Sequence, residues 1–90
     1  MKKIELKQDI DDDFTPDVFL DPETGVCEIS GDSYIDNAYT FYKDIIEWFG
    51  EFCSDASRTL KFDIKLSYYN TSTTDCIYEI LNIIKNFQDK

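Results

Sequence analysis

Residues 60–68 alternate between apolar and polar side chains, and this alternation constrains the fold more than any other feature of the sequence. The apolar positions are Leu60, Phe62, Ile64, Leu66 and Tyr68, and Lys61, Asp63, Lys65 and Ser67 lie between them. A period of two predicts a β-strand with one buried and one exposed face. A strand covered on both faces would lose this pattern, so we expect helices on one side of the sheet only.

Two shorter strands are expected upstream. Residues 17–20 and 26–30 flank the turn sequence DPETG, in which Pro22 presets φ and Gly25 supplies the positive φ that a hairpin needs. Because Pro16 has no N–H to donate to a ladder, the first hairpin strand is expected at a sheet edge or as an extended arm. Residues 31–37, GDSYIDN, are expected to form a loop whose last residues cap the following helix.

Two helices are predicted from apolar residues that recur every three or four positions. The stripes consist of Ala38, Phe41, Tyr42, Ile45, Phe49 and Phe52 in the first helix and of Ile77, Ile80, Leu81, Ile84 and Phe87 in the second. The predicted fold is therefore a single α/β domain, residues 1–90, with element order β-β-α-β-α. It has a small mixed sheet, an N-terminal hairpin, helices on one face, and an acidic arm at residues 1–13.

The charge balance narrows the classes of partner. The chain holds 19 acidic and 9 basic residues, for a net charge of −10. Nucleic acids and anionic lipids bind through Lys and Arg, so neither is expected as a partner. No apolar run approaches the roughly 18 residues of a membrane span, and the three widely spaced cysteines are typical of buried thiols in a reducing cytoplasm. An acidic decoy that imitates nucleic acid stays open as an alternative.

Catalytic and metal-binding signals are sparse. The chain has no His, and it contains neither a G-x-x-x-x-G-K-[ST] nor a G-x-G-x-x-G phosphate loop. The run Asp11–Asp13 is interpreted as a solvated arm, with a weak cation site as the minor alternative. We therefore assign no catalytic residue, no metal site and no cofactor.

The sequence NTSTT, residues 70–74, lies where the alternating strand meets the second helix. Asn70, Ser72 or Thr73 can cap that helix, and Ser72 with Asp75 resembles a capping box. A cap needs only one residue, so capping leaves the other hydroxyl groups of this stretch without an assigned role. A phosphate at this place would meet free backbone N–H groups and the positive end of the helix dipole.

Several motifs together resemble the SiaC family of bacterial regulatory phosphoproteins. They are Thr15-Pro16, the GDSYIDN stretch, the helix with Trp48, and YYNTS at residues 68–72, and the resemblance spans about residues 15–87. It implies a STAS-like fold and a partner switch: a serine/threonine kinase and a metal-dependent phosphatase modify the protein, and the unmodified form binds a target such as a diguanylate cyclase. The family also continues through another strand and helix, for which this sequence has no counterpart.

The resemblance also implies site residues. The phosphoacceptor is the hydroxyl residue after the Asn of the YYNTS stretch, which is Thr71 in this chain. The predicted partner-binding residues are Asp32, Ser33, Tyr34, Asn37, Asn70 and Ser72. An incomplete sheet would leave an open edge that invites pairing with a second chain, and a homodimer is one such arrangement.

Two other function classes remain as alternatives. A passive acidic interaction module would keep the fold without phosphorylation, and Asp75 favours it because the family usually has Lys soon after the hydroxyl run. The hypothesis that the chain is an enzyme is supported only by scattered carboxylates.

Overall fold

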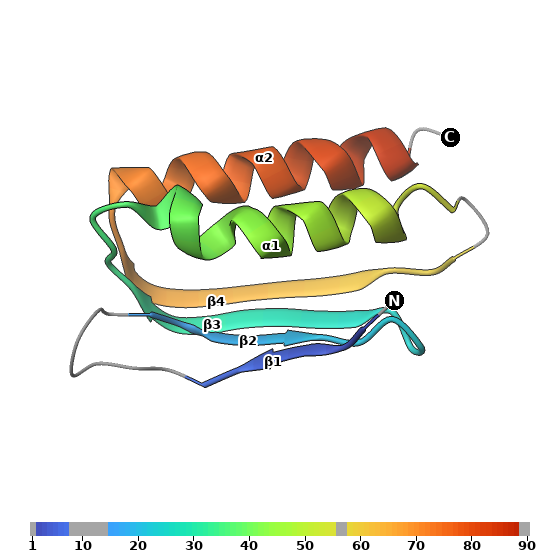
Figure 1. The fold of residues 1–90 in the computed structure, drawn as a ribbon, viewed down its shortest axis with the longest axis horizontal. Coiled ribbons are helices and arrows are strands. Elements are labelled where there is room, and N and C mark those ends of the chain that lie inside the picture. The colour runs from blue at the N-terminus through green and yellow to red at the C-terminus, as the bar shows by residue number, and fades with distance from the viewer. Residues whose placement is uncertain (1, 8–14, 56–57, 89–90) are drawn as a thin grey trace.

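A four-stranded mixed sheet carries two helices on one face in the computed structural model, which describes residues 2–7, 15–55 and 58–88 (Figure 1). The elements are β1 (Ile4–Leu6), β2 (Asp17–Leu20), β3 (Val26–Ser33), α1 (Ala38–Phe52), β4 (Lys61–Tyr69) and α2 (Thr71–Gln88). The strand order is β1-β2-β3-β4, with antiparallel β1/β2 and β2/β3 pairs and a parallel β3/β4 pair. The predicted mixed sheet, the β2–β3 hairpin and the one-sided helical layer are confirmed.

The first strand, β1, was not predicted. It pairs with β2 through Ile4 opposite Leu20 and Leu6 opposite Val18. The expectation that β2 is an edge strand or an arm is therefore wrong, since β2 lies between β1 and β3. Pro16 precedes β2, so its missing N–H removes no ladder bond within that strand. The acidic cluster at residues 9–13 lies outside the described residues.

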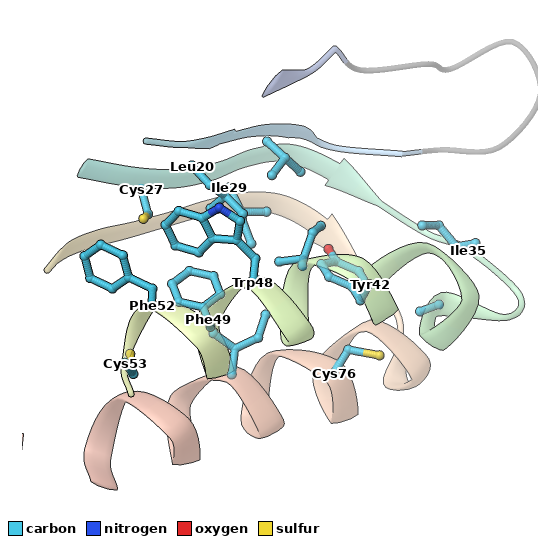
Figure 2. Close-up of a cluster of buried hydrophobic side chains, with 14 residues drawn as sticks. Leu20, Cys27, Ile29, Ile35, Tyr42, Trp48, Phe49, Phe52, Cys53 and Cys76 are labelled. Atoms are coloured by element: carbon cyan, nitrogen blue, oxygen red, sulfur yellow. The ribbon is translucent and has the colours of Figure 1, made fainter. Parts of the chain in front are cut away.

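The core fills the space between the sheet and both helices (Figure 2). Trp48 is buried and stacks on Phe52 with ring centroids 5.2 Å apart, and its indole Nε1 donates a 2.8 Å hydrogen bond to the Lys2 carbonyl. The buried hydrophobic residues are Val18, Leu20, Cys27, Ile29, Ile35, Ala38, Tyr42, Ile45, Trp48, Phe49, Phe52, Cys53, Cys76 and Ile80. The predicted stripe of α1 is buried except for the partly buried Phe41. The predicted stripe of α2 puts only Ile80 in the buried core, Leu81 is 40% exposed, and β4 is only partly covered.

The three cysteines are buried, as the sequence predicted for thiols used as small apolar side chains. Burial raises the pKa of the Cys27 thiol to about 12 and also raises the pKa of Cys76. Both groups are therefore neutral thiols at neutral pH rather than reactive thiolates.

A β-bulge interrupts the alternation of β4. Gly31 pairs with Leu66 but Asp32 pairs with Tyr68, so Ser67 is an extra residue on β4. The bulge turns Tyr68 to the open face of the sheet, where its ring stacks on Tyr34, and the prediction that Tyr68 lies on the buried face is wrong. The same register shows that β3 continues through residues 31–33, which were expected to form a loop.

Candidate partner-binding and phosphorylation site

The parallel strands β3 and β4 end at the same edge of the sheet, where the loop to α1 and the start of α2 meet (Figure 1). Asn70 links β4 to α2 and holds both sides of this edge. Its side-chain oxygen accepts a 2.9 Å hydrogen bond from the Thr73 N–H, and its side-chain nitrogen donates a 2.9 Å bond to the Ile35 carbonyl. Asn70 is therefore the cap of α2 and also fixes the β3–α1 loop.

Ser72 has a different capping role from the one predicted. Its hydroxyl oxygen accepts a 3.1 Å hydrogen bond from the N–H of Ala38, the first residue of α1. Asn37 occupies the N-cap position of α1 but makes no side-chain capping bond there. The hydroxyl of Ser72 thus caps the neighbouring helix instead of forming a capping box with Asp75.

A buried chain of hydroxyl groups joins β3, α1 and α2. Ser33 Oγ lies 2.8 Å from the Tyr42 hydroxyl and 2.9 Å from Thr73 Oγ1, and Thr73 Oγ1 donates a 2.8 Å bond to the Ser33 carbonyl. Each hydroxyl has one proton, so the donors must run from Tyr42 to Ser33 to Thr73 to the Ser33 carbonyl. All three side chains have 0% exposure, and burial raises the pKa of Tyr42 to about 12, so this phenol keeps its proton.

The predicted partner-binding residues fall into two groups. Ser33, Asn70 and Ser72 lie inside the hydrogen-bond network, and the fully buried Ser33 has no surface to offer a partner. The others face outward: Tyr34 and Asn37 are exposed and Asp32 is partly exposed.

Thr71 is the first residue of α2 and is exposed. Among the residues of NTSTT, Asn70, Ser72, Thr73 and Thr74 all have side-chain hydrogen bonds, the last from Thr74 Oγ1 to the Asn70 carbonyl at 3.1 Å. Within the described part of the chain, the Thr71 hydroxyl has no such partner. The first turn of α2 carries no acidic residue that would oppose an added phosphate.

Exposed Tyr68 and Tyr69 are the part of this edge that the sequence analysis missed. Tyr34 and Tyr68 stack with ring centroids 5.0 Å apart and 16° between their planes, and they are 44% and 56% exposed. Tyr69 is also 56% exposed and lies on the helix side, where it lines a groove with Thr73 and Thr74. The exposure of Tyr68 depends on the bulge, for which the alternating pattern gave no signal. Tyrosine rings at a protein surface are typical of binding interfaces.

The described residues offer neither a metal site nor a membrane span. The described residues contain no group of three or more His, Cys, Asp or Glu side chains that could hold a metal ion. Across the same residues, neither helix combines the length and apolar character that crossing a membrane requires.

Comparisons with known proteins agree with this geometry. The model of a family described as SiaC family regulatory phosphoprotein matches residues 10–90. Apo-SiaC from Pseudomonas aeruginosa has a TM-score of 0.90 and 28% identity, and the match covers 99% of this chain and 71% of that one. A chain in the crystal structure of the diguanylate cyclase SiaD in complex with its activator SiaC, also from Pseudomonas aeruginosa, has a TM-score of 0.81 and 29% identity over 99% of this chain and 69% of that one.

A curated relative is an uncharacterized protein of Pseudomonas aeruginosa. It is 34% identical over 71 residues, which are 79% of this chain and 56% of that protein. The chain thus spans little more than half the length of the curated relative that it matches.

Proposed function

Because this chain belongs to the SiaC family of regulatory phosphoproteins, we propose that it is a non-enzymatic partner switch controlled by reversible phosphorylation of Thr71. In the unmodified form the edge around Thr71 binds a diguanylate cyclase. A serine/threonine kinase adds the phosphate and a metal-dependent phosphatase removes it.

The observation that carries this proposal is the state of the five side chains in NTSTT. Four of them are held by hydrogen bonds that cap helices or close the buried hydroxyl chain, and modification of any of these would break the local structure. Thr71 is exposed and forms none of these bonds. A kinase can therefore reach its hydroxyl without unfolding the start of α2.

A phosphate on Thr71 is compatible with the fold but not with an unchanged interface. It would stand at the N-terminus of an 18-residue helix, where the dipole and the backbone N–H groups favour negative charge. It would also add about −1.5 to −2 charges at the sheet edge that carries the exposed Tyr34, Asn37 and Tyr68. A partner that packs on these side chains would meet new bulk and new charge.

The proposed target follows from the SiaC relative that activates the diguanylate cyclase SiaD. The exposed Tyr34–Tyr68 stack supports the same conclusion, because tyrosines supply large, rigid contact area at interfaces.

Intact-mass measurement of the protein isolated from its native host tests the switch. We expect a species heavier by one phosphoryl group that phosphatase treatment removes and that the Thr71→Ala variant lacks. Thr40→Ala, at another exposed threonine in the first turn of a helix, is the matched control and should keep the modification. Persistence of the phosphate in Thr71→Ala would contradict the assignment.

A passive acidic interaction module is the second candidate, favoured by the net charge of −10 and by the exposed Asp75 in the second turn of α2. The two candidates differ in a binding assay with the cyclase. The switch requires phosphorylated and unmodified protein to bind with different affinity, whereas the passive module binds equally in both forms.

A further inference from the structure

A hollow of about 550 Å³ lies at the start of α1, between the β3–α1 loop, the first turn of the helix and the residue two positions before β2. Its lining combines two apolar side chains with four polar ones, which are Ile35 and Phe41, and Thr15, Asp36, Asn37 and Thr40. Ile35 is buried at the end of the core and Phe41 is partly buried, whereas Asp36, Asn37 and Thr40 are exposed (Figure 2). The hollow therefore has an apolar floor and a polar rim, the usual composition of a binding pocket.

Asn37 on this rim is free of the role that its position in the helix normally gives it. An Asn at the N-cap accepts a hydrogen bond from the second or third N–H group of its helix. The Asn37 side chain accepts none, because the Ser72 hydroxyl oxygen caps α1 instead. The side chains of Asp36 and Thr40 likewise form no hydrogen bond or ion pair within residues 2–7, 15–55 and 58–88. The rim thus offers a carboxylate and an amide oxygen as acceptors for an incoming group.

The charges around the hollow favour a cation. Residues 15–42 contain six acidic side chains and no Lys or Arg. Lys43 lies one turn of α1 beyond Thr40 but forms no ion pair with Asp36 or any other described residue. The whole chain has a net charge of −10, which attracts a basic group and repels an acidic one.

The dipole of α1 opposes a cation at this place, but it is the weaker effect. Its positive end corresponds to about half an elementary charge. The Ala38 N–H, one of the groups that carry this charge, already donates to Ser72 Oγ. Asp36 contributes a full negative charge directly before the N-cap residue Asn37. The local balance at the rim is therefore negative.

We propose that this hollow binds an arginine side chain of a partner protein. The guanidinium donates hydrogen bonds to the Asp36 carboxylate and the Asn37 side-chain oxygen, and the aliphatic stem packs on Ile35 and Phe41. Arginine fits better than lysine, because its planar fork donates to two acceptors at once and stacks on an aromatic ring. The proposal depends neither on phosphorylation of Thr71 nor on a cyclase as the target.

Binding of short peptides to the unmodified full chain tests the proposal. The probe is a blocked pentapeptide with one arginine between glycines, and the two reference peptides carry lysine or the uncharged isostere citrulline at the same place. Backbone amide shifts of the protein in NMR titrations report the binding. We expect the arginine peptide to shift the amides of residues 35–41 to saturation and to bind about fivefold more tightly than the citrulline peptide, which corresponds to about 1 kcal/mol. The lysine peptide should bind with intermediate affinity.

Two variants that each remove one negative charge separate local from long-range attraction. Asp36→Asn should weaken binding of the arginine peptide by about fivefold or more, because it removes the charged acceptor at the rim. Glu51→Gln, at the other end of α1, should leave the affinity within about twofold. Both side chains are exposed, so neither variant should unfold the domain.

Three results would overturn the proposal. The first is the absence of saturable shifts at residues 35–41. The second is equal binding of the arginine and citrulline peptides, or equal weakening by Asp36→Asn and Glu51→Gln, which would leave only attraction by the net charge. The third is self-association of the chain, measured by sedimentation, that Asp36→Asn abolishes and Glu51→Gln does not; the occupant would then be a second copy. A failure of the Thr71 switch would change none of these measurements.

Discussion

Replacing Thr73 by valine tests whether the buried hydroxyl chain stabilises the fold. Valine has the same shape as threonine, so the change removes the hydroxyl without leaving a large cavity. Thr73 Oγ1 makes two hydrogen bonds to Ser33, one to the hydroxyl at 2.9 Å and one to the carbonyl at 2.8 Å. Both partners would stay buried, since Ser33 has 0% exposure.

The expected cost follows from these two bonds. A typical intramolecular hydrogen bond contributes about 0.5 to 1.5 kcal/mol, and a buried group that loses its partner costs about 1 to 3 kcal/mol. Ser33 Oγ still accepts from the Tyr42 hydroxyl, but the Ser33 O–H loses its acceptor and the Ser33 carbonyl loses its side-chain donor. We expect Thr73→Val to lower the free energy of unfolding by about 2 to 3 kcal/mol, and the melting temperature by about 10 to 20 °C.

Thr71→Val is the control for this measurement. It makes the same substitution two residues earlier in the same helical turn, at an exposed hydroxyl without a hydrogen-bond partner in the described chain. Its effect should stay within about 0.5 kcal/mol. Urea unfolding of both variants, with an unchanged m-value, gives the comparison. A loss below about 0.5 kcal/mol for Thr73→Val, or an equal loss for Thr71→Val, would refute the reasoning.

Three further predictions concern the glycines, the α1 cap and alkaline stability. Gly25→Ala should destabilise the protein by more than about 2 kcal/mol in thermal unfolding, because φ is +76° and the new Cβ would collide with the Thr59 carbonyl. Gly50→Ala has open space around the new Cβ in helix α1 and should stabilise the protein by about 0.5 to 1 kcal/mol. Stability changes of the same sign in both variants would contradict this prediction. Ser72→Ala should cost about 1 kcal/mol by removing the cap of α1, and unchanged urea stability would show that the cap contributes nothing. Burial raises the pKa of Tyr42 from 10.0 to about 12, so the unfolded state loses the phenol proton at a lower pH than the folded state. The free energy of unfolding should therefore fall as pH rises from about 10 to 12, and Tyr42→Phe should make this fall smaller. Equal pH profiles of stability for the two proteins would contradict the prediction.

Periodicity predicted the elements that carry most of the core. The stripe of α1 and the spacing of the β2–β3 hairpin rest on local rules, namely turn chemistry at residues 21–25 and apolar residues every three or four positions. β1 escaped prediction because three residues are too few for a pattern, and its pairing with β2 is set by a partner distant in sequence. The bulge at Ser67 likewise arises from the register between β3 and β4, which no single strand encodes.

The candidate site divides in the same way. Family resemblance pointed to Thr71 and to the GDSYIDN stretch, and local capping rules named Asn70 and Ser72 as helix caps. Neither the resemblance nor the capping rules could tell which helix each of these two residues caps. Ser72 serves α1 because the start of α2 lies against the start of α1 in space, 34 positions away in the sequence.

By itself, the sequence determined the class of fold, the acidic surface and the presence of surplus hydroxyls at residues 70–74, because these depend on composition and on spacing within one element. Only the tertiary structure decided which hydroxyls are surplus. It commits Ser72 to another helix and Thr73 to a buried chain with Ser33 and Tyr42, and it leaves Thr71 exposed. The physical reason is that a hydroxyl is satisfied by whichever donor or acceptor lies within about 3 Å, and packing rather than chain order determines which group that is.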